Sequence, residues 1–128
     1  MKTLCFSGKI FSGKGEGAKF VTLAWVRKQI RKELGFEPYP GTLDLRITGE
    51  DTRRKKPLLE GGVTILPPKG FCRGRLFRAC FKTELECGVV VPEVAGYPED
   101  VIEIIAPENL REKFHLSDGD KVEIEVRV

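Results

Sequence analysis

Short runs in which apolar and polar residues alternate recur along this chain and set narrow limits on its fold. In the last run, Val122, Ile124, Val126 and Val128 occupy every second position, which places their side chains on one face of a strand. Further strands are predicted at residues 2–11, 43–47, 62–66, 70–81, 86–91 and 101–105. Strands and helices do not alternate, so the pattern favours a mainly β, mostly antiparallel barrel of six to eight strands.

Helical periodicity is confined to a small part of the chain. One helix is predicted at residues 24–34, where apolar residues recur at helical spacing and charged residues fill the other face. A second, short helix is predicted at residues 107–114, which open on a proline. Residues 20–23 are predicted to be extended and residues 49–57 to form a polar loop. The length suits a single domain, residues 1–128, with one or two short helices.

Charge and apolar content narrow the class of protein. The chain has 22 basic and 19 acidic residues, a balance that does not demand nucleic acid but allows a local anionic ligand. Its apolar runs are too short to span a bilayer, and the N-terminus lacks the long apolar stretch of a signal peptide. The four cysteines include no C-x-x-C pair, so reduced cysteines are expected. These features predict a cytoplasmic protein with no membrane partner.

A glycine-rich segment after the first predicted strand is the first candidate site. Backbone N–H groups in such a turn can form an anion-binding concavity, and glycine lets phosphate oxygens approach the backbone. The segment matches neither a P-loop, because Gly15 replaces the Ser or Thr, nor a dinucleotide fingerprint, because no βαβ unit follows. It is therefore either a phosphate-binding loop or a mobile surface turn. Its members are Gly13, Lys14, Gly15, Glu16, Gly17 and Ala18.

Two further candidates combine acidic, hydroxyl and basic side chains. Thr42 and Asp44 stand two apart at a strand start and so face the same side of the sheet. Hard oxygen ligands of this kind suit Mg²⁺ beside substrate phosphates, although they equally suit a surface turn. Glu103 interrupts an apolar strand, and Arg111 lies one turn into the predicted helix. A solvated face and an ordinary salt bridge are the alternatives for these two residues.

These signals occur together in the order found in a known family. The chain resembles the archaeal CTP-dependent riboflavin kinases over nearly its whole length. Four motifs carry the resemblance: GKGEGAKFV at 13–21, LGFEPYPGTLDL at 34–45, IEIIAPENLR at 102–111 and LSDGD at 116–120. Some members of that family also carry an N-terminal winged-helix domain, and a single riboflavin kinase domain at residues 1–128 without it is expected here.

The resemblance implies a fold, an activity and a set of site residues. The fold would be a cradle-loop barrel, and the activity would be phosphorylation of riboflavin to FMN, with CTP converted to CDP and Mg²⁺ as cofactor. Residues 13–18 would wrap the CTP phosphates and ribose, and Thr42 and Asp44 would hold Mg²⁺. Glu103 would contact the flavin and orient or deprotonate its hydroxyl. The nucleotide would also contact Glu108, Asn109, Leu110 and Arg111.

Two positions depart from the family pattern. Asp44 stands where the family usually has Asn. The aspartate keeps an oxygen ligand for the metal and adds a negative charge. Ala95 stands at a flavin-binding position where the family usually has Thr, so a hydroxyl that would hydrogen-bond the flavin is missing. An unpaired buried polar group costs roughly 1–3 kcal/mol. Flavin affinity is therefore expected to differ from that of the family.

Two other classes of function remain as alternatives. A nucleic-acid-binding regulator built on a related barrel is suggested by residues 116–128, which resemble swapped-hairpin transcription factors, and by the basic run 53–56. It predicts a dimer with salt-sensitive DNA binding, and it leaves Thr42 and Asp44 without a role. A non-catalytic flavin- or nucleotide-binding module is suggested by Ala95. We expect the kinase, as a monomer, with CTP/CDP and riboflavin/FMN as partners.

Overall fold

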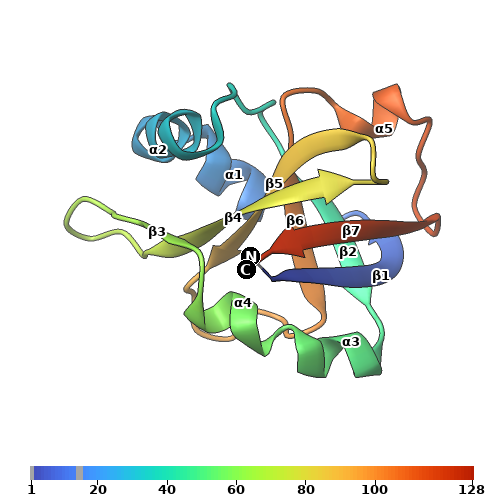
Figure 1. Cartoon of the computed structure of the whole chain (residues 1–128). Coiled ribbons are helices and arrows are strands. Elements are labelled where there is room, and N and C mark those ends of the chain that lie inside the picture. Colours follow the sequence, from blue (N-terminus) through green and yellow to red (C-terminus); the bar gives the residue numbers. More distant parts are fainter. Residues whose placement is uncertain (1, 14–15) are drawn as a thin grey trace.

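Seven antiparallel strands form the body of the protein in a computed structural model that describes residues 2–13 and 16–128 (Figure 1). The strand order is β3-β4-β5-β6-β2-β1-β7, and β4 also pairs with β7. This last pairing closes six strands into a barrel and leaves β3 as an extra edge strand. The predicted fold class is confirmed. The strands are β1 (Thr3–Phe11), β2 (Leu43–Ile47), β3 (Val63–Ile65), β4 (Gly74–Phe81), β5 (Leu85–Pro92), β6 (Val101–Ile105) and β7 (Lys121–Arg127).

Alternation in the strands fills the barrel. Val122, Ile124 and Val126 of β7 are buried, as predicted, while the residues between them are exposed or half-buried. Apolar side chains from the other barrel strands meet them in one core, which also takes in Leu58 from α4 (Lys56–Glu60). Burying such side chains contributes roughly 1.5–3 kcal/mol each, which is the main force that holds the barrel closed.

A second apolar cluster covers the outside of β4, β5 and β6. It is formed by α1 (Glu16–Thr22) and α2 (Ala24–Leu34), whose side chains pack on outward-facing strand residues such as Val90 and Ile105. Every residue of β6 is buried, and the second cluster covers the outer face of this strand at Ile105. The predicted helix at 24–34 is confirmed to the residue, and it ends at Gly35 in the left-handed conformation.

Several local predictions were wrong. The strand predicted at 70–81 begins only at Gly74, after a turn. Residues 20–22 belong to α1 rather than to an extended piece, because Phe20 and Val21 are buried against the second cluster. The expected polar loop at 49–57 contains α3 (Gly49–Arg54) and the start of α4. In α3 acidic residues occupy the first turn and basic residues the last, which favours the helix dipole. The last helix, α5 (Leu110–Lys113), is shorter than the predicted 107–114.

The helices lie on different sides of the barrel. In Figure 1, α2 lies at the upper left of the barrel, whereas α3 and α4 lie below it. In the described ranges, every helix is too short or too polar to cross a membrane. Lys14 and Gly15, both predicted to contact phosphate, lie outside the described residues.

Candidate functional site

Two carboxylates face each other across neighbouring strands. The antiparallel register pairs Asp44 of β2 with Glu103 of β6. Their strand neighbours Leu45, Ile102 and Ile104 point into the barrel core, so Asp44 and Glu103 point to the outer face. Like charges placed directly opposite each other destabilise a sheet. An arrangement that weakens the bare fold is typical of a functional site.

Two hydroxyl groups hold these carboxylates in place. The Thr42 Oγ1 atom lies 3.0 Å from Asp44 Oδ1 and 3.2 Å from Glu103 Oε1. The Tyr97 hydroxyl donates to Glu103 Oε2 at 2.5 Å. A threonine hydroxyl has one proton, so it donates to one of the two carboxylates at a time. The cluster therefore presents more acceptor oxygens than its own donors can satisfy.

Burial changes the protonation of both acids. It raises the pKa of Glu103, and the negative charge of Asp44 raises it further, against hydrogen bonds from Tyr97 and Thr42 that lower it. Burial also raises the pKa of Asp44, which is opposed by hydrogen bonds with Thr42, Glu103 and the Gly13 backbone, and by the charge of Arg111. The pair thus holds a proton to a higher pH than isolated carboxyl groups do, and a bound cation would reverse this tendency.

The donor set of this cluster fits a divalent cation of the magnesium type. Thr42 and Asp44, the predicted ligands, lie within hydrogen-bond distance of each other, and Glu103 adds a second carboxylate. Within the described residues, no group of three or more His, Cys, Asp or Glu side chains gathers to form a metal site. Mg²⁺ commonly takes one or two carboxylates and fills its other positions with phosphates and water.

The glycine-rich segment begins directly against this cluster. A Cβ atom added to Gly13 would lie 2.2 Å from Asp44 Oδ2, so only glycine lets the backbone pass this close. The structure therefore brings Gly13 and Asp44 together, as their predicted roles require. Glu16, Gly17 and Ala18 begin α1, so the segment is helical in its second half rather than a loop throughout. Phosphate binding by residues 13–18 stays a prediction.

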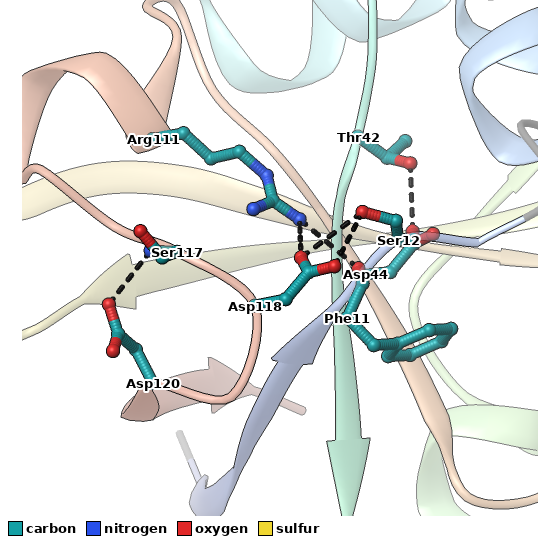
Figure 2. Close-up of polar contacts among 8 residues, drawn as sticks. All are labelled: Phe11, Ser12, Thr42, Asp44, Arg111, Ser117, Asp118 and Asp120. Carbon is teal, nitrogen blue, oxygen red and sulfur yellow. Dashed lines mark hydrogen bonds and ion pairs between the residues drawn. The ribbon is translucent and has the colours of Figure 1, made fainter.

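Arg111 joins this region to the far end of the chain. Its Nη2 atom donates to Asp118 Oδ1 at 2.7 Å and to the Phe11 carbonyl at 3.2 Å. The Ser12 hydroxyl donates to Asp118 Oδ2 at 2.8 Å. Figure 2 shows Arg111 and Ser12 converging on the Asp118 carboxylate, close to Thr42 and Asp44. The hydrogen bonds from Arg111 and Ser12 lower the pKa of Asp118.

A small cavity of about 120 Å³ connects the second and third candidate sites. Thr42 lines it together with Glu108 to Arg111, the second group of predicted nucleotide contacts. Asn109 caps α5 by accepting from the Glu112 N–H, and its Nδ2 atom lies 3.2 Å from the Tyr39 hydroxyl. The Leu110 side chain is largely buried in the barrel core, so only a small part of this residue is exposed to the cavity.

Two larger cavities meet at Tyr97. One of about 660 Å³ is lined by Ala95, the predicted flavin contact, and by basic residues that include Lys55 and Arg75. The other, of about 340 Å³, is mainly apolar and is lined by Phe20, Trp25 and Phe71 among others. Tyr97 lines both cavities, and its hydroxyl bonds Glu103. Tyr97 thus connects the carboxylate cluster to a surface that can receive a flat aromatic ligand.

Lys55 is a buried member of the basic run 53–56, which was expected to lie in a polar loop. It is 4% exposed, and its Nζ atom donates to the Val101 carbonyl at 2.6 Å and to the Pro98 carbonyl at 3.4 Å. The same atom lies 5.3 Å from the centre of the Tyr97 ring. Burial lowers the pKa of Lys55. Lys55 therefore ties the turn before β6, which carries Tyr97, to the α3–α4 segment.

Comparison with known proteins decides the family. The family model CTP-dep_RFKase, described as "Domain of unknown function DUF120", matches residues 10–126. The chain belongs to this family. Relatives named riboflavin kinase include proteins of Methanoregula boonei, 41% identical, and Methanospirillum hungatei, 39% identical. The matches cover 93% and 98% of this chain but 55% and 58% of those relatives. A riboflavin kinase of Saccharolobus solfataricus is 38% identical over 94% of this chain and 73% of its own length. The chain thus spans little more than half the length of the first two relatives.

Three residues of this CTP-dep_RFKase chain were not predicted as site residues. Tyr97 stands beside Ala95, but no local pattern points to its contact with Glu103. Asp118 lies in the LSDGD motif, which signals a turn and does not reveal an ion pair with Arg111. Lys55 is one of four consecutive basic residues at 53–56, and nothing in the run distinguishes the one that is buried.

Proposed function

We propose that this chain is a CTP-dependent riboflavin kinase, which transfers the γ-phosphoryl group of CTP to the 5′-hydroxyl of riboflavin and forms FMN and CDP. One observation carries the proposal: the glycine-rich segment starts against the Asp44–Glu103 pair, and Thr42 and Arg111 line one cavity beside it. The name of the matching family supports CTP as the donor, and the names of the relatives support riboflavin as the acceptor.

The nucleotide would lie between the glycine-rich segment and α5. Backbone amides of residues 13–18 would contact its phosphates, and residues 108–111 would contact other parts of the nucleotide. Arg111 is suited to this role because a guanidinium presents several donors to phosphate oxygens in a fixed geometry. Phosphoryl transfer needs positioning and charge neutralisation more than covalent help, so a site made of amides and a cation is adequate.

Thr42 and Asp44 would hold Mg²⁺ next to the phosphates. A bound Mg²⁺ neutralises charge on the transferring phosphoryl group. Asp44, where the family usually has Asn, adds one negative charge to the oxygen ligand. We therefore expect metal binding to be retained and to be more strongly pH-dependent than with Asn.

Glu103 would act on the acceptor hydroxyl. Its Oε2 atom is engaged by Tyr97, while its Oε1 atom faces Thr42. The 5′-hydroxyl of riboflavin would donate to Glu103 and lose its proton to that carboxylate as the phosphoryl group arrives. The raised pKa of Glu103 suits this work, because a base is most effective when its pKa lies near the working pH.

The flavin ring would lie in the apolar cavity beside Tyr97. Phe20, Trp25 and Phe71 line that cavity, and the rings of Trp25 and Phe71 have centroids 5.7 Å apart. Ligand sites for flat aromatic molecules are typically apolar and aromatic with few polar groups. From there the ribityl chain would run past Tyr97 towards Glu103. Ala95 lines the adjoining cavity and offers no hydroxyl to the flavin.

A direct assay tests the proposal. The purified chain is mixed with riboflavin, Mg²⁺ and either CTP or ATP, and FMN is separated and quantified. We expect FMN with CTP and much less with ATP. The metal role is tested by Asp44→Asn, which keeps an oxygen ligand and should keep activity, against Asp44→Ala, which should lose it. Absence of FMN with both nucleotides would exclude the kinase, and binding of CDP and FMN without turnover would favour a non-catalytic module.

A further inference from the structure

We propose that Asp118 is a positioning residue of the nucleotide site, because its carboxylate holds Arg111 and Ser12 in one arrangement. Arg111 belongs to the segment assigned to the nucleotide, and Ser12 immediately precedes the glycine-rich segment. Asp118 would thus fix the two halves of the site relative to each other before the nucleotide arrives. This inference rests on the proposed function and adds a residue to it.

The contacts of Asp118 reach both halves at once. Its Oδ1 atom accepts from Arg111 Nη2 at 2.7 Å, and its Oδ2 atom accepts from Ser12 Oγ at 2.8 Å. Arg111 makes a further bond to the Phe11 carbonyl, so its guanidinium has two fixed acceptors at the end of β1. The next residue, Gly13, lies against Asp44. The entrance to the glycine-rich segment is therefore held at Ser12 by Asp118 (Figure 2). It is held at Gly13 by a second carboxylate, Asp44.

The turn that carries Asp118 is itself attached to β1. Gly119 N–H donates to the Ile10 carbonyl at 2.7 Å, and Ile10 N–H donates to the Asp120 carbonyl at 2.9 Å. Within the turn, the Ser117 N–H donates to Asp120 Oδ2 at 2.8 Å. These bonds fix the backbone on both sides of Asp118. Its carboxylate is therefore presented from a defined position, which a positioning residue requires.

Stability alone does not explain this carboxylate. The Asp118 side chain is 54% exposed and the Arg111 side chain 34% exposed, and exposed ion pairs add little to the stability of a fold. A carboxylate near a polyphosphate is also unfavourable unless it is neutralised. A long side chain loses entropy when a ligand orders it. Holding the guanidinium in its bound position beforehand reduces that entropy cost of binding. We therefore assign Asp118 to the preparation of the nucleotide site rather than to the stability of the fold.

The test compares Asp118→Ala with wild type in nucleotide binding and in turnover. We expect the Kd for CDP and the KM for CTP to rise about tenfold, as expected for the loss of one ordered charged contact. The kcat and the KM for riboflavin should stay near wild type, because Asp118 contacts neither Glu103 nor Tyr97. Asp118→Asn retains the size and one acceptor oxygen, so it should recover part of the affinity.

Two controls separate positioning from a structural effect. Asp120→Asn removes a neighbouring carboxylate charge but keeps an oxygen that can accept from the Ser117 N–H, so the turn that presents Asp118 is retained and nucleotide affinity should stay unchanged. In an Arg111→Ala background, Asp118→Ala should raise Kd by clearly less than it does in the wild-type background, because only the contact with Ser12 is then left to lose. Equal, additive losses in the two backgrounds would overturn the proposal.

The remaining outcomes are also decisive. Unchanged CDP affinity in Asp118→Ala overturns the proposal. Tighter binding overturns it as well, because it would mean that Asp118 competes with phosphate for Arg111. A wild-type chain that binds CDP but forms no FMN refutes the kinase. The test of Asp118 stays valid in that case, because the Kd for CDP measures its effect without turnover. A wild-type chain that binds no nucleotide overturns both.

Discussion

The two polar networks that meet at the candidate site differ in burial. Glu103 is 5% exposed and Lys55 4%, and the bonds of this network pass through Tyr97 and the turn before β6. Asp118 and Arg111 lie at the surface and bond Ser12 and backbone groups of β1. Buried polar groups are costly when a partner is removed, whereas exposed ones are rescued by water. Changes in the buried network should therefore alter stability and activity together, and changes in the exposed network should alter function alone.

The largest effect is expected at Glu103. Glu103→Gln removes the proposed base, so turnover should fall by roughly 10²–10⁴-fold. The same change removes the repulsion between Glu103 and Asp44, so the free energy of unfolding without ligand should rise by about 0.2–1 kcal/mol. Activity assays and denaturant titrations measure the two quantities. A variant that is both active and less stable would contradict the assignment of Glu103 as a functional residue.

The next largest effect concerns Lys55. Lys55→Met keeps the length of the side chain but leaves the Val101 and Pro98 carbonyls without this donor, which should lower the free energy of unfolding by about 1–3 kcal/mol. Activity should also fall, because the turn that carries Tyr97 loses its hydrogen bonds to Lys55. Lys56→Met is the matched control, since Lys56 is exposed. Urea denaturation of both variants tests this, and equal effects would show that burial of Lys55 is unimportant.

A smaller, pH-dependent effect should come from the carboxylate pair. Burial raises the pKa of Glu103 and of Asp44 in the folded chain, so the folded state holds protons more tightly than the unfolded state. Their contribution to stability is complete below the usual values of 4.5 and 3.8, and it is lost as the pH rises through the higher folded values. Thermal midpoints of wild type and Glu103→Gln between pH 4 and pH 8 should therefore diverge as the pH rises, and Mg²⁺ should reduce the difference. Parallel curves would contradict the shifted pKa.

The smallest effect on stability is expected in the exposed network. Ser12→Ala and Asp118→Asn should leave the thermal midpoint unchanged, because surface ion pairs and hydroxyls contribute little to folding. Both variants should nevertheless weaken nucleotide binding, and the difference from wild type in the Asp118 variant should shrink at high salt as exposed charges are screened. Calorimetric scans and CDP titrations measure these quantities. Clear destabilisation of Asp118→Asn would remove the contrast between the two networks.

Sequence patterns predicted the parts of the site that depend on local spacing. Thr42 and Asp44 were paired because they stand two apart on one strand, and the structure bonds them to each other. The α2 helix was predicted to the residue because its apolar spacing is regular. The α1 helix was missed because its burial against the strands, and not a local pattern, decides its conformation. The α3 helix resembled a loop because its residues are mostly polar. The α4 helix begins with Lys56 and Pro57, the last two residues of that expected loop.

Local patterns were enough to predict a mainly β barrel of the CTP-dep_RFKase type, because alternation and motifs are properties of neighbouring residues. Three features of the site became visible only in the folded chain: Asp44 lies opposite Glu103, Lys55 is the buried lysine of its run, and Asp118 bonds Arg111. Strand register and burial are set by contacts between residues far apart in the chain, where a shift of one residue moves every side chain to the other face. No local spacing encodes such contacts.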